Sequence, residues 1–114
     1  KHAYSPINPM DVHNVRGGYG PTTSIPRPFN AGFEASGEVV EAGKDLQSKF
    51  KPGDKVYYFH VGSWAEYAAV NGDSVHVLPE GTPIDVASCA QVNPMTVHCM
   101  LLELQAEGHK SVVH

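Results

Sequence analysis

Short runs of β-branched and aromatic residues, each bounded by glycine or proline, dominate the first two thirds of the chain. Runs of this kind are typical of β-strands that are separated by tight turns. Strands that are about four to eight residues long, with turn signals between them, predict a small barrel or sandwich. The expected strands are Glu38–Glu41 within the segment Phe33–Ala42, and then Lys55–Phe59, Trp64–Val70 and Ser74–Leu78.

Turn and helix signals complete this first part of the chain. Lys51–Asp54 reads Lys-Pro-Gly-Asp, which favours a type II turn because proline fixes the first corner and glycine accepts a positive φ at the second. Asn8 precedes a proline, which disfavours a helical conformation at Asn8 and suits it to cap a short helix over Met10–Val15. Asp11 is expected to stabilise the start of that helix.

The hydrophobic period changes after residue 82, where helical patterns replace the strands. Ile84–Ala90 is expected to be helical, and Asn93 is expected to cap a second helix with Pro94 at its first position. Gly108 should end that helix, and Lys110–His114 resembles a strand that has just begun. One apolar stripe at positions i, i+3, i+4 and i+7 is formed by Val97, Met100, Leu101 and Leu104.

Composition restricts the function more than the fold. The chain has 114 residues, a globular composition and a formal net charge of −4, which argues against nucleic acid as a partner. No apolar run approaches the ~20 residues that span a bilayer, so no membrane insertion is expected. Cys89 and Cys99 fit neither a disulfide framework nor a zinc spacing, so we expect two buried, reduced thiols in an intracellular protein.

The two ends suggest that the chain is part of a longer protein. The first residues resemble the end of a strand that runs into a turn, and the last five resemble a strand without its partner. A strand needs a neighbour, so a terminal strand normally continues into further structure.

Several motifs, in this order, resemble the medium-chain dehydrogenase/reductase superfamily, and most closely its zinc-free enoyl reductases and quinone oxidoreductases. One such motif is weak evidence, but several in register are specific. They are Ile7-Asn8-Pro9 with Asp11, a Gly-x-Tyr loop at residues 17–19, AGFEASGEVVEAG at 31–43, KPGDKV at 51–56, GSWAEYAAV at 62–70, VNPMTVHCML at 92–101 and GHKSVVH at 108–114.

This resemblance implies a mainly β fold, the GroES-like and partly open barrel of the superfamily's catalytic domain. Residues 1–92 would form the barrel domain without its first strands. Residues 93–114 would form the connecting helix and the first strand of a truncated Rossmann domain. No Gly-x-Gly-x-x-Gly motif occurs in the sequence, so the cofactor would be bound mainly by parts outside this chain.

The resemblance also bears on metal binding. Zinc alcohol dehydrogenases have Gly-His-Glu where this chain has Gly32-Phe33-Glu34, and phenylalanine cannot bind a metal. None of the seven histidines has a convincing ligand spacing to a cysteine or carboxylate. We therefore expect no metal.

The candidate site residues follow from the same resemblance. In the enoyl reductase branch the tyrosine of the Gly-x-Tyr loop is assigned as a catalytic acid, which corresponds to Tyr19. A phenol stays protonated at neutral pH and can donate its proton, although a loop tyrosine can equally pack its ring on the barrel rim. Positions equivalent to Asn8, Asn93 and Thr96 line the nicotinamide end of the cleft in related reductases, whereas helix capping is the alternative for both asparagines.

Two further residues are expected to be structural. Glu34 would brace the glycine-rich turns, and Trp64 would pack in the barrel core.

Two hypotheses for function follow. In the first, the chain is the catalytic-domain segment of a zinc-independent oxidoreductase that uses NADPH or NADH to reduce an activated C=C bond, in an enoyl thioester or enone, or a quinone. In the second, it is a non-catalytic structural or interaction subunit built from a truncated reductase domain. The expected partners are a small-molecule substrate and the nicotinamide cofactor, in a homodimer or a larger assembly, and in either the cytoplasm or the mitochondrion.

Overall fold

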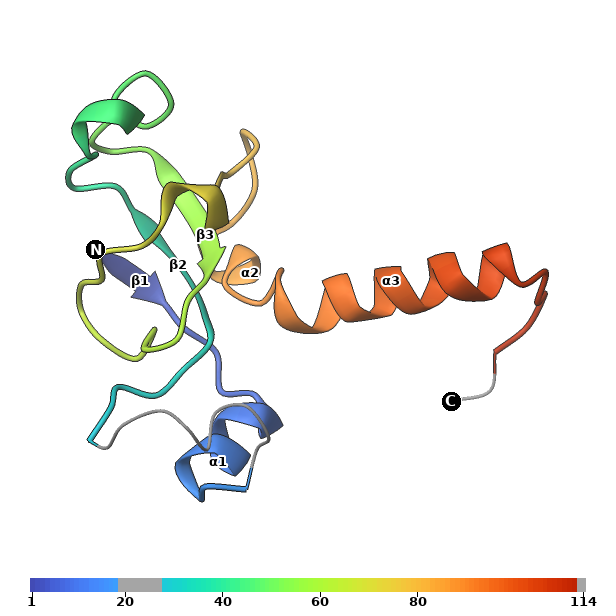
Figure 1. Ribbon diagram of the computed structural model, residues 1–114. Helices are drawn as coiled ribbons and strands as arrows, with labels where there is room; N and C mark the ends of the chain where they lie inside the picture. The colour runs from blue at the N-terminus through green and yellow to red at the C-terminus, as the bar shows by residue number, and fades with distance from the viewer. Residues whose placement is uncertain (19–27, 113–114) are drawn as a thin grey trace.

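A computed structural model describes residues 1–18 and 28–112, and its centre is an open antiparallel sheet of four strands (Figure 1). The strands are β1 (His2–Tyr4), β2 (Glu34–Glu38), β3 (Lys55–Phe59) and β4 (Val75–Val77). Their order in the sheet is their order in the sequence, and every neighbouring pair is antiparallel. The sheet agrees with the predicted GroES-like fold. The description "mainly β" fits loosely, because among the described elements the longest helix has 15 residues and no strand exceeds five.

The alternation of β3 explains where the core lies. Val56 and Tyr58 are buried while Lys55 and Phe59 are exposed, as expected for a strand with one face on the core. The buried cluster is small and consists of Ala35, Phe50, Val56 and Tyr58. Burial of the Tyr58 phenol raises its pKa to about 12.

The second strand does not lie where the sequence predicted it. β2 begins at Glu34 and ends at Glu38, with Gly37 inside the strand, so the expected strand over Glu38–Glu41 is wrong. A Cβ atom at Gly37 would collide with the backbone of Lys1 and His2. The glycine therefore does not stop the strand but allows β1 to approach β2 closely.

The predicted strand Trp64–Val70 is also wrong, because this segment bends and forms no regular strand. Its backbone groups bind separate partners: Trp64 N donates to Ala31 O over 2.8 Å, and His2 N donates to Glu66 O over 2.8 Å. Such scattered bonds cannot form a ladder. Trp64 is 39% exposed and not in the core as predicted, while its Nε1 donates to Pro6 O over 3.1 Å.

Other expected elements are confirmed. β3 has the predicted bounds, β4 lies within the predicted strand, and helix α1 (Pro9–Val15) begins one residue before the predicted range. Helix α2 (Ile84–Ala87) forms the first part of the predicted helix over 84–90. Gly53 has φ of 93°, as its predicted turn requires. In the described part of the chain, two short 3-10 helices, η2 (Lys44–Leu46) and η3 (Gly72–Ser74), lie in the connections.

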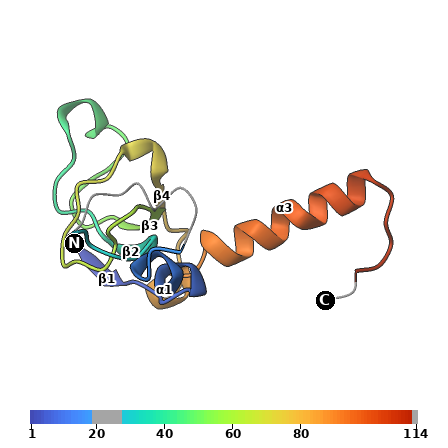
Figure 2. The same cartoon turned by 60° about the horizontal axis from the view of Figure 1, so that its bottom comes forward.

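Helix α3 (Val92–Ala106) starts beside the sheet and extends away from it, and both ribbon views show its later turns apart from the rest of the domain (Figures 1 and 2). No residue of α3 is buried, and Val97, Met100 and Leu101 of the predicted apolar stripe are each more than half exposed. Met95 and Leu102 place further apolar side chains on the opposite side of the helix, and an apolar helix of this kind is typical of a buried environment.

The C-terminal part differs from expectation in two further respects. Both cysteines are exposed, so the prediction of buried thiols is wrong. Lys110–Val112 has no regular structure, and the rest of the predicted last strand lies outside the described residues.

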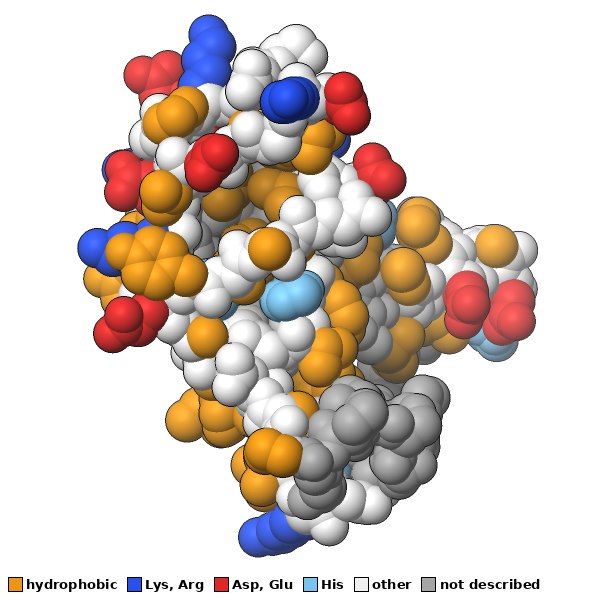
Figure 3. All heavy atoms as spheres, turned by 60° about the vertical axis from the view of Figure 1, so that its left-hand side comes forward, with side chains coloured by type: hydrophobic (Ala, Val, Ile, Leu, Met, Phe, Trp, Pro, Cys, Tyr) orange, Lys and Arg blue, Asp and Glu red, His pale blue; other side chains and the backbone are white. Residues whose placement is uncertain are grey.

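The sheet and the segment 67–70 enclose an open cavity of about 430 Å³. Most of the residues that line it are apolar, among them Phe50, Val56 and Tyr58 from the core, and Lys1, Glu38 and Glu41 add charged groups. Figure 3 shows hydrophobic side chains over the face that contains the N-terminal strand, with charged side chains mainly along its upper and left margins. Of the predicted site residues, Asn8, Asn93 and Thr96 lie within the described part of the chain, and none of these three lines the cavity.

Candidate functional site

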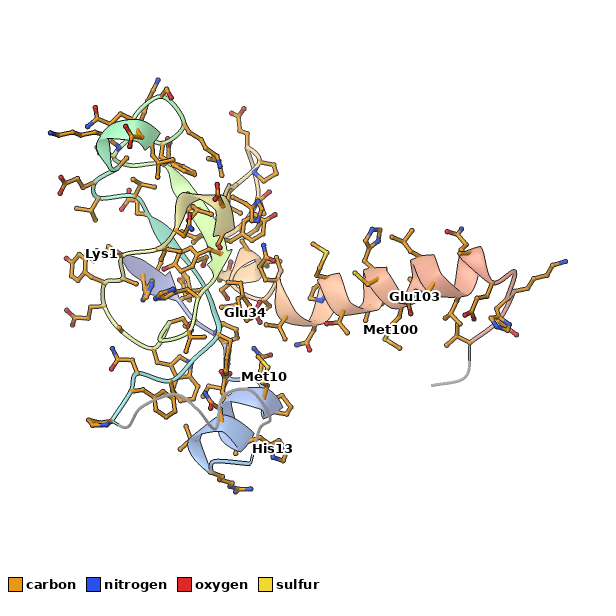
Figure 4. All side chains as sticks on the ribbon, in the orientation of Figure 1. Lys1, Met10, His13, Glu34, Met100 and Glu103 are labelled. Carbon is orange, nitrogen blue, oxygen red and sulfur yellow. The ribbon has the colours of Figure 1, made fainter. Side chains whose placement is uncertain are left out.

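Glu34 lies at the centre of the candidate site, at the first position of β2 and only 1% exposed. Its Oε1 accepts a hydrogen bond from Asn8 Nδ2 over 2.9 Å. Its Oε2 accepts from Gln91 N over 3.0 Å and from Val92 N over 2.9 Å. Figure 4 shows Glu34 at the junction between the sheet and the first turn of α3. One carboxylate therefore joins the starts of α1 and α3 to the sheet.

The two backbone bonds to Glu34 also determine where α3 begins. The first N–H groups of a helix have no partner inside the helix, and Glu34 supplies one for Gln91 and Val92. The helix consequently starts at Val92 with Gln91 as its N-cap, so the prediction that Asn93 is the cap is wrong. Because a distant carboxylate performs this task, the side chain of Asn93 can bind elsewhere.

Asn93 instead donates a hydrogen bond from Nδ2 to Oδ1 of Asn8 over 3.0 Å. Asn8 is 5% exposed and therefore uses its amide in both directions, toward Glu34 and toward Asn93. We call the series Glu34–Asn8–Asn93 the amide chain. It runs from the buried end of β2 to an exposed residue in the first turn of α3.

Asp11 holds Asn8 from the other side. Its Oδ2 accepts from Asn8 N over 2.6 Å, which confirms the predicted role of Asp11 at the start of α1. Asp11 is completely buried, and among the described residues its Oδ1 has no hydrogen-bond partner. Burial raises the pKa of Asp11 above its usual range; the Asn8 N–H opposes this rise, and the nearby charge of Glu34 adds to it.

Two serines fix the backbone of Glu34. Ser5 Oγ donates to Glu34 O over 2.7 Å and lies 3.0 Å from Ser63 Oγ. Ser63 is fully buried, and its N donates to Gly32 O over 3.4 Å. The position of the carboxylate thus depends on three segments that are far apart in the sequence.

Thr96, the other described residue of the predicted site, is not part of the amide chain. Thr96 is exposed, and its Oγ1 donates to Val92 O over 2.6 Å within α3, one turn along from the residues that Glu34 holds. Tyr19 lies outside the described residues.

Phe33 occupies the position that corresponds to a zinc-binding histidine in the resemblance described above. Its ring is buried, and its centre lies 5.9 Å from that of Phe59. Within residues 1–18 and 28–112, no group of three or more His, Cys, Asp or Glu side chains is placed to hold a metal ion.

Sequence reasoning missed the part that Glu34 plays. It predicted a structural glutamate that braces the glycine-rich turns, whereas Glu34 accepts side-chain and backbone donors at the starts of two helices. The available signal was an acidic residue flanked by Phe33 and Ala35 in an apolar run, since a buried charge needs several partners.

Comparison with known proteins identifies the family. The profile of the alcohol dehydrogenase GroES-like domain matches residues 1–80, which is more than half of the chain. The chain therefore belongs to this domain family. The predicted membership of the medium-chain dehydrogenase/reductase superfamily is confirmed.

Individual relatives agree with this assignment. The chain is 36% identical over 99 residues to a protein named mitochondrial enoyl-[acyl-carrier-protein] reductase from Caenorhabditis elegans, covering 85% of the chain and 28% of that relative. It is 34% identical over 83 residues to a highly reducing polyketide synthase from Dothideomycetidae sp., covering 71% of the chain and 3% of that relative. It is 32% identical over 117 residues to a probable quinone oxidoreductase from Schizosaccharomyces pombe, covering all of the chain and 34% of that relative.

The chain thus spans about a third or less of the length of these curated relatives. Of the helices in the described residues, none is both long and apolar enough to cross a bilayer.

Proposed function

We propose that this chain is the catalytic-domain part of an oxidoreductase that uses NADPH or NADH to reduce an activated C=C bond or a quinone. The observation that carries the proposal is the amide chain, which leads from buried Glu34 to an exposed amide at Asn93. It occurs in a domain whose relatives are named enoyl reductase and quinone oxidoreductase. An exposed amide held in one orientation suits a ligand with its own hydrogen-bonding group, such as nicotinamide.

The proposed domain division follows the predicted one. Residues 1–92 contain the whole sheet and the small core, while 93–114 contain most of α3 and the segment after it. In this proposal α3 connects the GroES-like domain to a nucleotide-binding domain. The apolar surface of α3 supports a covered position, because no residue of this helix is buried and Val97, Met100 and Leu101 are each more than half exposed.

The chemistry divides between cofactor and protein. The bound cofactor supplies hydride to the substrate's electrophilic carbon. The Tyr19 phenol would then donate its proton to the adjacent carbon or to the carbonyl oxygen, which completes a two-electron reduction. Asn8 and Asn93 would orient the nicotinamide end of the cofactor, and Thr96 would border the same pocket. We further propose that the enzyme prefers NADPH to NADH.

Zinc independence is also part of the proposal. In the zinc branch a histidine takes the place of Phe33. In this chain the ring of Phe33 is buried near Phe59. A hydride acceptor conjugated to a carbonyl needs a proton donor or hydrogen-bond donor, and a phenol can supply this without a metal.

The experiment uses the full-length native polypeptide that carries this chain. Oxidation of NADPH and of NADH is followed with a trans-2-enoyl thioester and with a quinone, before and after treatment with a strong zinc chelator. We expect turnover with at least one substrate class and an unchanged rate after chelation. No cofactor-dependent reduction of either class would refute the activity, and loss of the rate on chelation would refute zinc independence alone.

The same experiment distinguishes the alternative, a structural or interaction subunit. That function predicts no cofactor binding and no turnover in the native assembly. A mitochondrial location is named for several relatives, and for this protein we propose either the cytoplasm or the mitochondrion.

A further inference from the structure

We infer that Glu34 fixes the direction of the hydrogen bonds in the amide chain, so that Asn93 presents its Oδ1 to the ligand as an acceptor. The site would then select a ligand group that donates N–H, such as a primary carboxamide. The ligand part of this inference rests on the proposed function, whereas the orientation of the amides does not. Glu34 is a positioning residue in this account, because it acts through Asn8 and Asn93.

The direction of these hydrogen bonds is determined first by two backbone N–H groups at the start of α3. Gln91 N and Val92 N can only donate, and both point at Glu34 Oε2. An ionised carboxylate can only accept, so Oε1 also requires a donor from its other neighbour. That neighbour is Asn8, which must therefore turn its Nδ2 toward Glu34, as the 2.9 Å bond shows.

The direction then passes through Asn8. Because this residue is buried, an amide turned the wrong way would leave two acceptors facing each other without water to separate them. With Nδ2 committed to Glu34, Asn8 Oδ1 faces Asn93 and accepts from its Nδ2 over 3.0 Å. Asn8 can therefore transmit only one polarity.

As a consequence, the exposed end of the amide chain is a hydrogen-bond acceptor. The Nδ2 end of Asn93 faces Asn8, so its Oδ1 lies at the other end of the amide and has no partner among the described residues. An amide oxygen has two lone pairs and can accept from a ligand N–H. A ligand that offers only an acceptor at this point would face oxygen against oxygen.

The substitution Glu34→Gln should reverse the direction of every hydrogen bond between side chains in the amide chain. The carbonyl of the introduced glutamine must stay on Gln91 N and Val92 N, so its side-chain NH2 group would face Asn8. Asn8 would then turn its Oδ1 toward position 34 and its Nδ2 toward Asn93. Asn93 would accept with Oδ1, and its Nδ2 would become the outward group. The change is a single oxygen to NH2 at nearly constant volume.

A second substitution should restore the original direction. In the double variant Glu34→Gln with Asn8→Asp, the introduced amide donates to one oxygen of the introduced carboxylate, whose other oxygen accepts from Asn93 Nδ2. The net charge of the chain equals that of the wild type. Asn8→Asp alone places two carboxylates together without a donor between them and should be the least stable of the three variants. Glu80→Gln, at an exposed position, is the matched control.

Two readouts on the native polypeptide test the inference. The first is NMR of the Asn93 side-chain amide, whose Nδ2 protons should show hydrogen-bond protection in the wild type and the double variant but lose it in Glu34→Gln. The second is the ratio of affinities for nicotinamide adenine dinucleotide and its 3-acetylpyridine analogue, which lacks the N–H donor. We expect Glu34→Gln to lower the affinity for nicotinamide adenine dinucleotide relative to that for the analogue by about five- to tenfold, and the double variant to restore it.

The outcomes separate the two claims. If neither dinucleotide binds the wild type, the proposed function fails, and the NMR arm alone decides the polarity. If both bind and the ratio is the same in wild type and Glu34→Gln, the selection by Asn93 is overturned while the proposed function stands. Unchanged Asn93 amide protection in Glu34→Gln, with the fold intact by circular dichroism, would overturn the polarity itself.

Discussion

Asn93 donates a 3.0 Å hydrogen bond to Asn8 although the two residues are 85 positions apart in the chain. The bond joins the first turn of α3 to the residue that precedes α1, and Asn8 in turn is bound to Glu34 at the start of β2. Three elements therefore meet at one buried carboxylate. The exposed end of this arrangement is the position where we propose that the cofactor binds.

Removal of the Glu34 carboxylate should destabilise the domain more than removal of any exposed carboxylate. In Glu34→Ala, Asn8 Nδ2, Gln91 N and Val92 N lose their acceptor at a buried site. We expect a loss of about 3 kcal/mol in the free energy of unfolding, measured by urea denaturation. The control Glu80→Ala, at an exposed position, should change it by less than ~0.5 kcal/mol. Equal effects of the two substitutions would contradict the central position of Glu34.

Asp11 should make stability depend on pH in an unusual direction. Burial raises its pKa in the folded state above the ordinary value of 3.8. Between these two pKa values the folded chain binds more protons than the unfolded chain, so this carboxyl group destabilises the fold increasingly as the pH rises through the interval. Asparagine in place of Asp11 cannot titrate and keeps an oxygen for Asn8 N.

The stability of Asp11→Asn relative to the wild type should therefore be highest near neutral pH and decline as the pH is lowered toward 3.8. Urea denaturation of both proteins across this range measures the difference. A relative stability that is independent of pH would show that Asp11 titrates normally in the folded protein.

Gly32 and Gly53 form a matched pair that separates backbone strain from packing. Both have a positive φ, of 91° and 93° respectively, so alanine is strained at either position. A Cβ at Gly53 would meet nothing, whereas one at Gly32 would collide with the side chains of Ser63 and Trp64. We expect Gly53→Ala to cost about 1 kcal/mol and Gly32→Ala at least about 2 kcal/mol more. Thermal denaturation of the two variants makes the comparison, and similar melting temperatures would exclude the collision.

Tyr19→Phe tests the proposed acid. The substitution removes the phenol oxygen and keeps the aromatic ring, so the proton donor is lost with little change in side-chain volume. In the native polypeptide kcat with the enoyl thioester should fall by about 100-fold, a magnitude typical of general acid catalysis, with a smaller change in KM. Tyr67→Phe, at an exposed position, is the control. An unchanged kcat would remove Tyr19 from the mechanism.

The sequence was most informative where local chemistry determines the structure. Lys55–Phe59 is a β-branched and aromatic run, Pro9 starts α1, and Gly53 turns the chain, and all three predictions are confirmed. The family was also identifiable, because its motifs occur in order over most of the chain.

Predictions from local sequence patterns were wrong where a residue far away in the sequence determines the structure. Gly37 appeared to stop a strand, but its missing Cβ admits β1. Asn93 appeared to be a helix cap, but a carboxylate 58 positions before Val92 performs that function. The convergence on Glu34 could not be predicted for the same reason, since its donors come from segments that only the fold brings together.

The affinity for the reduced cofactor is the most direct test of the proposed site. The dissociation constant of NADPH is measured by fluorescence titration of the native polypeptide and of its Asn93→Ala variant, with Gln105→Ala, at an exposed position near the other end of α3, as the control. We predict a constant about tenfold higher for Asn93→Ala and unchanged for Gln105→Ala. Equal affinities of wild type and Asn93→Ala would contradict the account, because the amide chain would then end away from the cofactor.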